Sequence, residues 1–269
     1  MPSFGDAILR GGFAPYSPPT SQRFGWAGLY VGGQIGYSSG NVNYGDSLHS
    51  MSEYLLRNLA IADQVSSMTT LPQESIRSRS FGAFIGYNWQ VDSNLIIGAE
   101  LNYSKLDLSS AASATTTGLI NNDTGVAAGH HLYYNVNVTG TASLRVKDYA
   151  TVRARGGWQV DQFLPYAFIG GAVGRADYNV TDTVAFTTTD IPDVTTPPTT
   201  PLTFAPFFDS KTDAKSDAII YGATAGLGVE VALLSNVFLR AEWEYIYFAP
   251  VHDIQVSINS GHVGIGLKF

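Results

Sequence analysis

Cysteine is absent from the 269 residues of the chain, and charged residues are scarce. Without cysteine there is no disulfide, no thiolate nucleophile and no cysteine-ligated metal site. Asp, Glu, Lys and Arg together make up 14% of the residues, against about 25% in an average soluble domain. The formal net charge is −7, so no basic footprint indicates a nucleic-acid partner.

Long apolar runs are also missing. No stretch approaches the roughly 18 consecutive apolar residues of a transmembrane helix. The start of the chain, MPSFGDAILRGGFAPYSPP, has an acidic residue, glycines and prolines where a signal peptide has its hydrophobic centre. We therefore expect this sequence to be a mature form if the protein is exported. A membrane could still be crossed by strands, whose alternating faces average out in hydropathy.

Strict alternation of apolar and polar residues is the main pattern that the chain does have. It is clear in NLIIGAELNYS, YATVRARGGWQV and VFLRAEWEYIYF, and it runs to the last residue in VGIGLKF. A period of two is typical of strands whose two faces lie in different environments. Eight segments share the pattern, at approximately residues 26–42, 75–90, 94–108, 144–160, 163–180, 213–232, 236–249 and 254–269.

Short and long connections alternate between these eight segments. Three are tight, around 91–94, 160–162 and 234–236, whereas those at about 44–74, 109–143 and 181–212 are long and the one at 249–253 is shorter. Hairpins joined in this way put all tight turns at one end and all long loops at the other. SEYLLRNLAIADQVSSM in the first long loop has helical spacing, and the prolines of IPDVTTPPTTPLTFAP in the third exclude a central strand.

The apolar faces could point inward, as in a soluble β-barrel, or outward, as in a membrane barrel. The outward arrangement is favoured because the opposite faces mix large charged residues with glycines, as a narrow lumen requires. The even strand count and alternating loop lengths also match outer-membrane barrels. Aromatic residues near the strand ends would form the interfacial girdles, namely Trp26, Tyr30, Tyr37, Trp89, Tyr103, Trp158, Tyr245 and Phe269.

The predicted fold is all-β: an eight-stranded antiparallel up-and-down transmembrane β-barrel over residues 26–269. We expect short periplasmic turns, long extracellular loops, and a periplasmic N-terminal tail over residues 1–25. Unpaired backbone groups cost several kcal/mol each in lipid, so the last strand must pair with the first and close the ring.

Four segments carry a family resemblance: WAGLYVGGQIGYSSG, GAFIGYNWQVDSNLIIGAELNY, YATVRARGGWQVDQFLPYAFIGGAVGRADY and the terminal VGIGLKF. They resemble the alphaproteobacterial outer-membrane immunogenic proteins, small porin-like barrels distantly similar to the membrane domain of OmpA. The resemblance covers nearly all of residues 26–269. It implies an outer-membrane location and a C-terminal aromatic residue, here Phe269, that the barrel-assembly machinery reads. The family is known mostly as abundant surface antigens, so no molecular activity follows.

Charged residues at inward positions form the first candidate site, because side chains just fill the interior of an eight-stranded barrel. They are Glu100, Arg153, Arg155, Glu230, Arg240, Glu242 and Glu244. An unpaired buried charge is costly. We therefore expect the three arginines to pair across the lumen with Glu100, Glu242 and Glu244, and Glu230 to lie lower and pair with Lys268 or water. The favoured interpretation is a polar plug that holds the barrel in shape; the alternative is a gated ion path.

Cations at outward positions near the long-loop end form the second candidate site. They are Arg77, Arg79, Lys105, Arg175 and Lys215. Just above an apolar band they would suit the phosphates of lipopolysaccharide, to which arginine can donate two hydrogen bonds at once. The alternative is that they only solvate the strand ends.

Nothing in the sequence indicates catalysis, a metal site or a cofactor, since HExxH, GxSxG and paired-cysteine motifs are missing. The adjacent His130 and His131, with Asp123 nearby, are poorly spaced to share one metal, and His262 is expected to hydrogen-bond in the lumen. Three functions remain: a structural outer-membrane protein that contacts lipid and lipopolysaccharide, with packing into homo-oligomers left open; an ion or small-solute pore; and an adhesin or receptor that acts through the Thr-rich loops.

Overall fold

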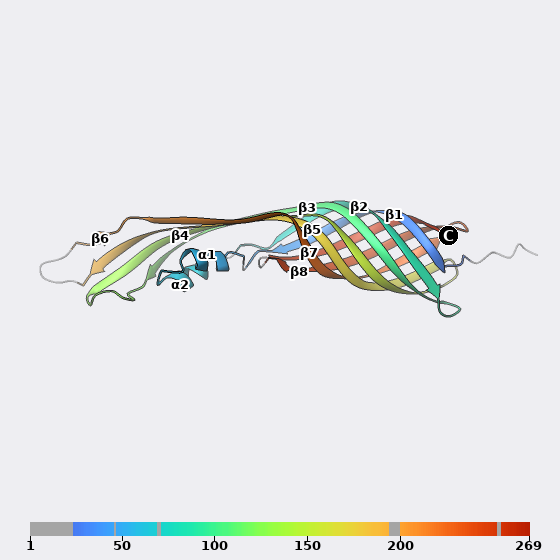
Figure 1. Cartoon of the computed structure of the whole chain (residues 1–269), viewed down its shortest axis with the longest axis horizontal. Helices are drawn as coiled ribbons and strands as arrows, with labels where there is room; N and C mark the ends of the chain where they lie inside the picture. Colours follow the sequence, from blue (N-terminus) through green and yellow to red (C-terminus); the bar gives the residue numbers. More distant parts are fainter. Residues whose placement is uncertain (1–23, 46, 69–70, 194–199, 252–253) are drawn as a thin grey trace, which may run out of the picture.

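The computed structural model describes residues 24–45, 47–68, 71–193, 200–251 and 254–269 (Figure 1). Nearly all of the expected N-terminal tail, and His252, lie outside these residues. No helix in these ranges is long and apolar enough to cross a membrane.

Eight long strands close an antiparallel ring, which confirms the predicted all-β up-and-down fold. Each strand pairs with its neighbour in sequence, and the last pairs with the first. A two-residue strand, β6 (Leu202–Thr203), adds to the far end of β5. The ring consists of β1 (Gly28–Asn43), β2 (Glu74–Gln90), β3 (Leu95–Asn121), β4 (His130–Trp158), β5 (Phe163–Pro192), β7 (Phe207–Ala232), β8 (Val237–Val251) and β9 (Ile254–Lys268).

The closing pair β1–β9 uses the chain to its last residue. Pairing runs from Asn43 opposite Gln255 to Tyr30 opposite Lys268. The backbone N–H of Phe269 then donates to the carbonyl oxygen of Leu29 at 2.8 Å. The barrel part of the sheet therefore has no free edge at the seam, as a barrel in a low-dielectric surrounding requires.

The strands are strongly tilted around the barrel axis (Figure 1). A row of paired residues that leaves β2 at Arg79 passes through Tyr37 on β1 and continues around the ring to return to β2 at Trp89, ten residues further along the strand. Such an offset is the register stagger that accompanies strand tilt in a closed barrel. Each row of paired residues consequently slopes from the long-loop end toward the tight-turn end.

Side chains alternate between the outer wall and the lumen, with the apolar face outward. Leu101 and Val152 are exposed on the wall, whereas their neighbours Glu100 and Arg153 are buried inside. The assignment of two aromatic residues to the outer girdle was wrong. Trp26 and Tyr30 are each 2% exposed and lie inside the barrel, because Tyr30 has the same parity on β1 as the inward-facing Gln34.

Two of the expected long loops are mostly strand. The second, 109–143, reduces to a connection at 122–129, and in the third, strand continues to Pro192 and resumes at Phe207. The ends of β3, β4, β5 and β7 run on past the barrel as a four-stranded sheet (Figure 1). We call this sheet the extension; it comprises residues 107–121, 130–146, 177–192 and 207–217.

The helix expected in the first long loop is confirmed as two short helices, α1 (His49–Leu55) and α2 (Ala62–Ser66). They pack on one face of the extension, where Leu56, Ile61 and Val65 are fully buried against Val136 and Val138. This packing explains why the extension forms, because alternate residues of its Thr-rich strands contact the apolar side chains of the helices. These segments were expected to be loops because their composition alone did not indicate such a contact.

Candidate functional site

The structure brings all seven predicted inward charges together across the middle of the lumen. Each is buried, with at most 5% of its surface exposed. Charges taken out of water in this way are tolerated only when they are paired and hydrogen-bonded. The residues are Glu100, Arg153, Arg155, Glu230, Arg240, Glu242 and Glu244.

Two linked clusters of ion pairs make up this layer. In the first, Arg153 donates to Glu242 Oε1 at 2.6 Å and to Glu244 Oε1 at 2.9 Å. In the second, Arg240 donates to Glu100 Oε1 at 3.1 Å and to Glu230 Oε1 at 3.0 Å. The two clusters meet where Arg153 lies 3.6 Å from Glu100.

The expected position of Glu230 was wrong. Its carboxylate pairs with Arg155 at 2.8 Å and with Arg240 at 2.7 Å, rather than with Lys268 or water. The reason is register: Glu230 on β7 lies directly opposite Arg240 on β8. Glu230 is therefore a full member of the central network.

Aromatic side chains complete the network, and the sequence analysis missed them. Tyr30 Oη donates to Glu100 at 2.8 Å, and Tyr166 Oη donates to Glu242 at 2.7 Å. The Arg155 guanidinium lies 3.9 Å from the centroid of the Tyr166 ring, a distance at which a cation is attracted to the ring face. The parity of Tyr30 and Tyr166 on their strands was the signal that could have placed them inside.

An aromatic cluster closes the lumen at the tight-turn end. Phe24, Trp26, Tyr30, Phe84 and Phe238 are all buried there. The Phe24 and Trp26 ring centroids are 4.5 Å apart, and Trp26 lies 6.0 Å from Phe238 in an edge-on arrangement. Trp26, just ahead of β1, thus helps to seal the barrel from within.

An apolar cluster closes the lumen at the long-loop end. It unites inward residues of the barrel strands, such as Ile246 and Phe248, with Leu48, Met51 and Leu71 from the β1–β2 connection. Between this cluster and the charges lies a thin polar layer, in which Ser38 Oγ is 2.8 Å from Ser260 Oγ. The lumen is therefore filled by apolar, polar, ionic and aromatic layers in turn.

Among the described residues, one group of side chains in the lumen is close enough together to hold a metal ion. Glu242, Glu244 and His262 each offer a ligand atom, and these atoms lie within 4.8 Å of one another. Arg153 already donates to both carboxylates, so they are paired with a cation. The expected hydrogen bond of His262 is not made to any described residue: it is 3% exposed, and neither ring nitrogen has a partner among them. The nearby carboxylates point toward Arg153, Tyr166 and Tyr149.

Four of the five predicted rim cations, Arg77, Arg79, Lys105 and Arg175, are exposed on the outer side of their strands. The outward assignment of Lys215 was wrong: a register shift in β7 places it opposite the buried Tyr178, on the inner face of the sheet. Arg175 forms an ion pair with Asp148. The other four, Arg77, Arg79, Lys105 and Lys215, form no ion pair with any residue in the described ranges. Three of the five stand at the end of the outward apolar run of their strand: Arg79 beyond Phe81, Lys105 beyond Tyr103, and Arg175 beyond Val173.

A belt of ion pairs that the sequence analysis missed lies where the barrel becomes the extension. Arg145 donates to both oxygens of Asp107 at 2.8 Å, and Lys147 bridges Asp177 at 2.8 Å and Asp217 at 2.9 Å. The belt coincides with register shifts in four adjacent strands. Such bulges redirect strands at barrel rims, and the charged run RVKD at 145–148 was the signal for them.

The two adjacent histidines lie at the far tip of the extension, not in the barrel. His131 Nδ1 is 2.7 Å from Asp123 and Nε2 is 3.2 Å from Asp193, while His130 Nδ1 is 2.8 Å from Asp190. The neighbouring carboxylates favour the protonated ring and raise the pKa of His131, Asp123 most strongly. The two histidines therefore bond to separate carboxylates and share no ligand.

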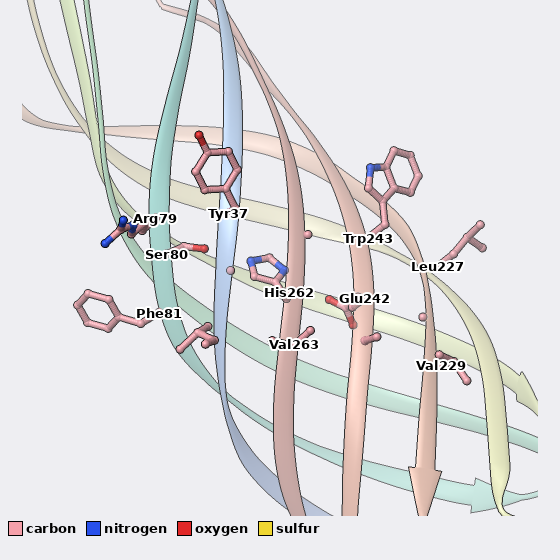
Figure 2. A pocket seen from close by; sticks show the side chains of 15 residues that line it. Tyr37, Arg79, Ser80, Phe81, Leu227, Val229, Glu242, Trp243, His262 and Val263 are labelled. Atoms are coloured by element: carbon pink, nitrogen blue, oxygen red, sulfur yellow. The ribbon is translucent and has the colours of Figure 1, made fainter.

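A groove of about 960 Å³ runs across the outer wall over five neighbouring strands (Figure 2). Gly261 and Ala241 form part of its floor. Trp243 and Leu227 stand on one side of the view, and Arg79 and Phe81 on the other. Its surface is mostly apolar, and the rim cation Arg79 is the one Arg or Lys among its lining residues.

Comparison with known proteins identifies the type of molecule. A family model for the outer membrane protein beta-barrel domain matches residues 17–269. The 31 kDa outer-membrane immunogenic protein of Brucella melitensis is 24% identical over 276 residues, which cover 98% of this chain and 92% of the relative. This match confirms the resemblance that the sequence motifs carried.

Solved structures with a similar chain path have low sequence identity. Ail of Yersinia pestis is 12% identical, with 90% of this chain and 99% of Ail covered and a TM-score of 0.35. Neisserial surface protein A is 14% identical, with 90% and 98% covered and a TM-score of 0.35.

Proposed function

Since the chain belongs to the outer-membrane β-barrel family, we propose that it is a structural protein of the bacterial outer membrane whose lumen is closed to solutes. The family and the Brucella relative support the location. We further propose that the tight turns and the tail over residues 1–25 face the periplasm, that the extension faces outward from the cell, and that Phe269 is read during barrel assembly.

The layered filling of the lumen carries this proposal. A conducting path would have to cross the cluster at Trp26 and Phe238, the ionic layer, and the cluster that includes Met51. Each arginine of the ionic layer bridges at least two carboxylates. Moving one arginine aside to open a path would therefore break several ion pairs at once. Protein interiors packed in this way leave few voids larger than a water molecule.

Planar-bilayer recording tests the closed lumen. We expect the refolded protein to show no stable open-channel steps, because the layers formed by the described residues fill the lumen. A large porin recorded in the same bilayers is the positive control for insertion. Stable steps whose size changes in Glu242→Gln or Arg155→Gln would assign conduction to the lumen, and the porin interpretation would replace the structural one.

The rim cations support a second part of the proposal, contact with lipopolysaccharide. Arg77, Arg79 and Lys105 project from neighbouring strands at the upper limit of the outward apolar band, without an ion-pair partner in the described ranges. Guanidinium groups bind phosphate with two parallel hydrogen bonds. A lipid with phosphate at its headgroup would supply the missing anions, and the contact would tie the barrel to the surrounding leaflet.

Replacing Arg77 and Arg79 together by glutamine is expected to lower the lipopolysaccharide retained by the purified protein several-fold, because both guanidinium donors are lost. Retention is measured by mass spectrometry after extraction in mild detergent. Arg145→Gln is the matched control, since Arg145 is exposed but already paired with Asp107. Equal retention by the double variant and the wild type would limit the rim cations to solvating the strand ends.

The extension favours one other candidate function, that of a surface receptor or adhesin. One face of the sheet is covered by α1 and α2. On the strands, exposed Thr and Ser side chains bond across neighbouring strands, as in Thr115–Thr139 at 3.2 Å and Thr181–Thr212 at 2.9 Å. A face rich in Thr and Ser of this kind suits contact with another surface molecule.

A further inference from the structure

The floor of the groove on the outer wall has a glycine at a position where the backbone conformation does not require one. Gly261 on β9 is paired directly with Tyr37 on one side and Trp243 on the other. A Cβ atom at Gly261 would meet nothing within 4 Å, and the residue is not among those with positive φ. A side chain could therefore start here without a clash at its Cβ, yet the floor is empty between two large aromatic walls.

A second outward glycine lies between much smaller neighbours. Gly171 on β5 is equally open, with nothing within 4 Å of its Cβ position. Its direct partners, however, are Val152 and Ala223, so it lies on a shallow part of the wall. Gly171 therefore provides a matched site with the same backbone freedom and no groove.

Charge and slope give the groove a direction. Arg79 lines its end at the rim, and Arg77 follows two residues further up β2. The row of paired residues from Arg79 to Leu227 slopes from the rim toward the tight-turn end. Tyr37 and Trp243 flank Gly261 within this row, so the gap at Gly261 lies below the level of Arg79. A ligand in the groove would thus meet a cation at the headgroup level and apolar walls as it descends.

We propose that this groove holds one acyl chain of a lipopolysaccharide molecule whose phosphate is bound by Arg79. The inference rests on the proposed contact between rim cations and lipopolysaccharide, and it assigns that contact to one bound molecule. An unpaired guanidinium attracts the phosphate, and the apolar walls bury the chain below it. Trp243 and Phe81 hold it from opposite sides.

Gly261→Leu tests the proposal, because it fills the floor without a steric conflict in the barrel wall. We expect the lipopolysaccharide retained after detergent extraction to fall several-fold, as in Arg79→Gln, whereas Gly171→Leu keeps the wild-type amount. Retained lipids are identified and counted by native mass spectrometry. Heat-modified migration in gel electrophoresis checks that all three variants are folded.

Three results would overturn the proposal, and they differ from failure of the rim contact. If Gly261→Leu retains lipopolysaccharide like the wild type while the Arg77/Arg79 double variant loses it, the rim contact stands and the groove is not its site. If the retained lipid that Gly261→Leu releases is a phospholipid, the assigned ligand is wrong. If Gly261→Leu instead converts a dimer to a monomer in light scattering, the groove is an interface between copies of the chain.

Discussion

Arg240→Met is expected to destabilise the barrel by about 3–5 kcal/mol, the usual cost of breaking a buried ion pair by removing one partner. Arg240 is 2% exposed and donates to two carboxylates, Glu100 at 3.1 and 2.5 Å and Glu230 at 3.0 and 2.7 Å. Methionine preserves much of the side-chain length and packing but supplies no positive charge. The two carboxylates would stay buried, and Arg155 would be the one arginine of the lumen network that still contacts both.

Urea unfolding in lipid vesicles, followed by tryptophan fluorescence, measures this effect as a lower midpoint. Arg145→Met is the control: Arg145 also bonds both oxygens of one carboxylate, at 2.8 Å, but it is exposed. Exposed ion pairs contribute little because solvent screens them, so its midpoint should stay close to the wild type. Equal losses in the two variants would mean that the lumen network is more hydrated than its burial indicates.

Gly170→Ala is expected to destabilise the barrel, whereas Gly171→Ala is expected to be neutral. At Gly170 an added Cβ would overlap the carbonyl oxygen of Val152 and lie 2.9 Å from the Cα atom of Arg153. Both are backbone atoms of the neighbouring strand, so they cannot move without breaking the β4–β5 pairing. Overpacking of this kind costs about 1–3 kcal/mol and sometimes more.

The neighbouring residue makes this a sharp comparison. Gly171 lies on the same strand and faces the outer wall, where an added Cβ meets nothing within 4 Å. Refolding yield, scored by heat-modified migration, should fall strongly for the first variant and match the wild type for the second. Similar yields for both would show that β5 can shift relative to β4, contrary to the fixed register described here.

The barrel itself was predictable because its two faces lie in opposite environments. In VRARGGWQV and LIIGAELNY, apolar residues that face the outer wall alternate with residues that face the lumen. A shift of the strand register by one position would turn the apolar residues into the lumen and the charged ones outward. The seven inward charges followed from the same parity. So did the pairing of the three arginines with Glu100, Glu242 and Glu244. Glu230 was the exception: it was assigned to Lys268 because height was counted from the turns, while the pairing between strands places it opposite Arg240.

The extension and the two seals were not predictable from local pattern. Segments such as SAASATTTG have the composition of loops, and they become strands because α1 and α2 cover one face. Trp26 and Met51 seal the lumen from outside the barrel strands, and no periodicity connects a residue before or between strands to the interior it fills. Tertiary packing decides these positions.

The ionic layer also has a consequence for the order of assembly. Its carboxylates and arginines are far apart in the chain: Arg240 bonds Glu100 across 140 residues, and Arg153 bonds Glu244 across 91. Contacts of such long sequence separation form late and slow the folding of β proteins. Until β8 joins the sheet, Arg153 lacks Glu242 and Glu244, and Glu100 lacks Arg240, so these groups need water. A partly folded barrel therefore has a water-filled interior. This water is displaced only when the last strands pair and the ionic layer is complete.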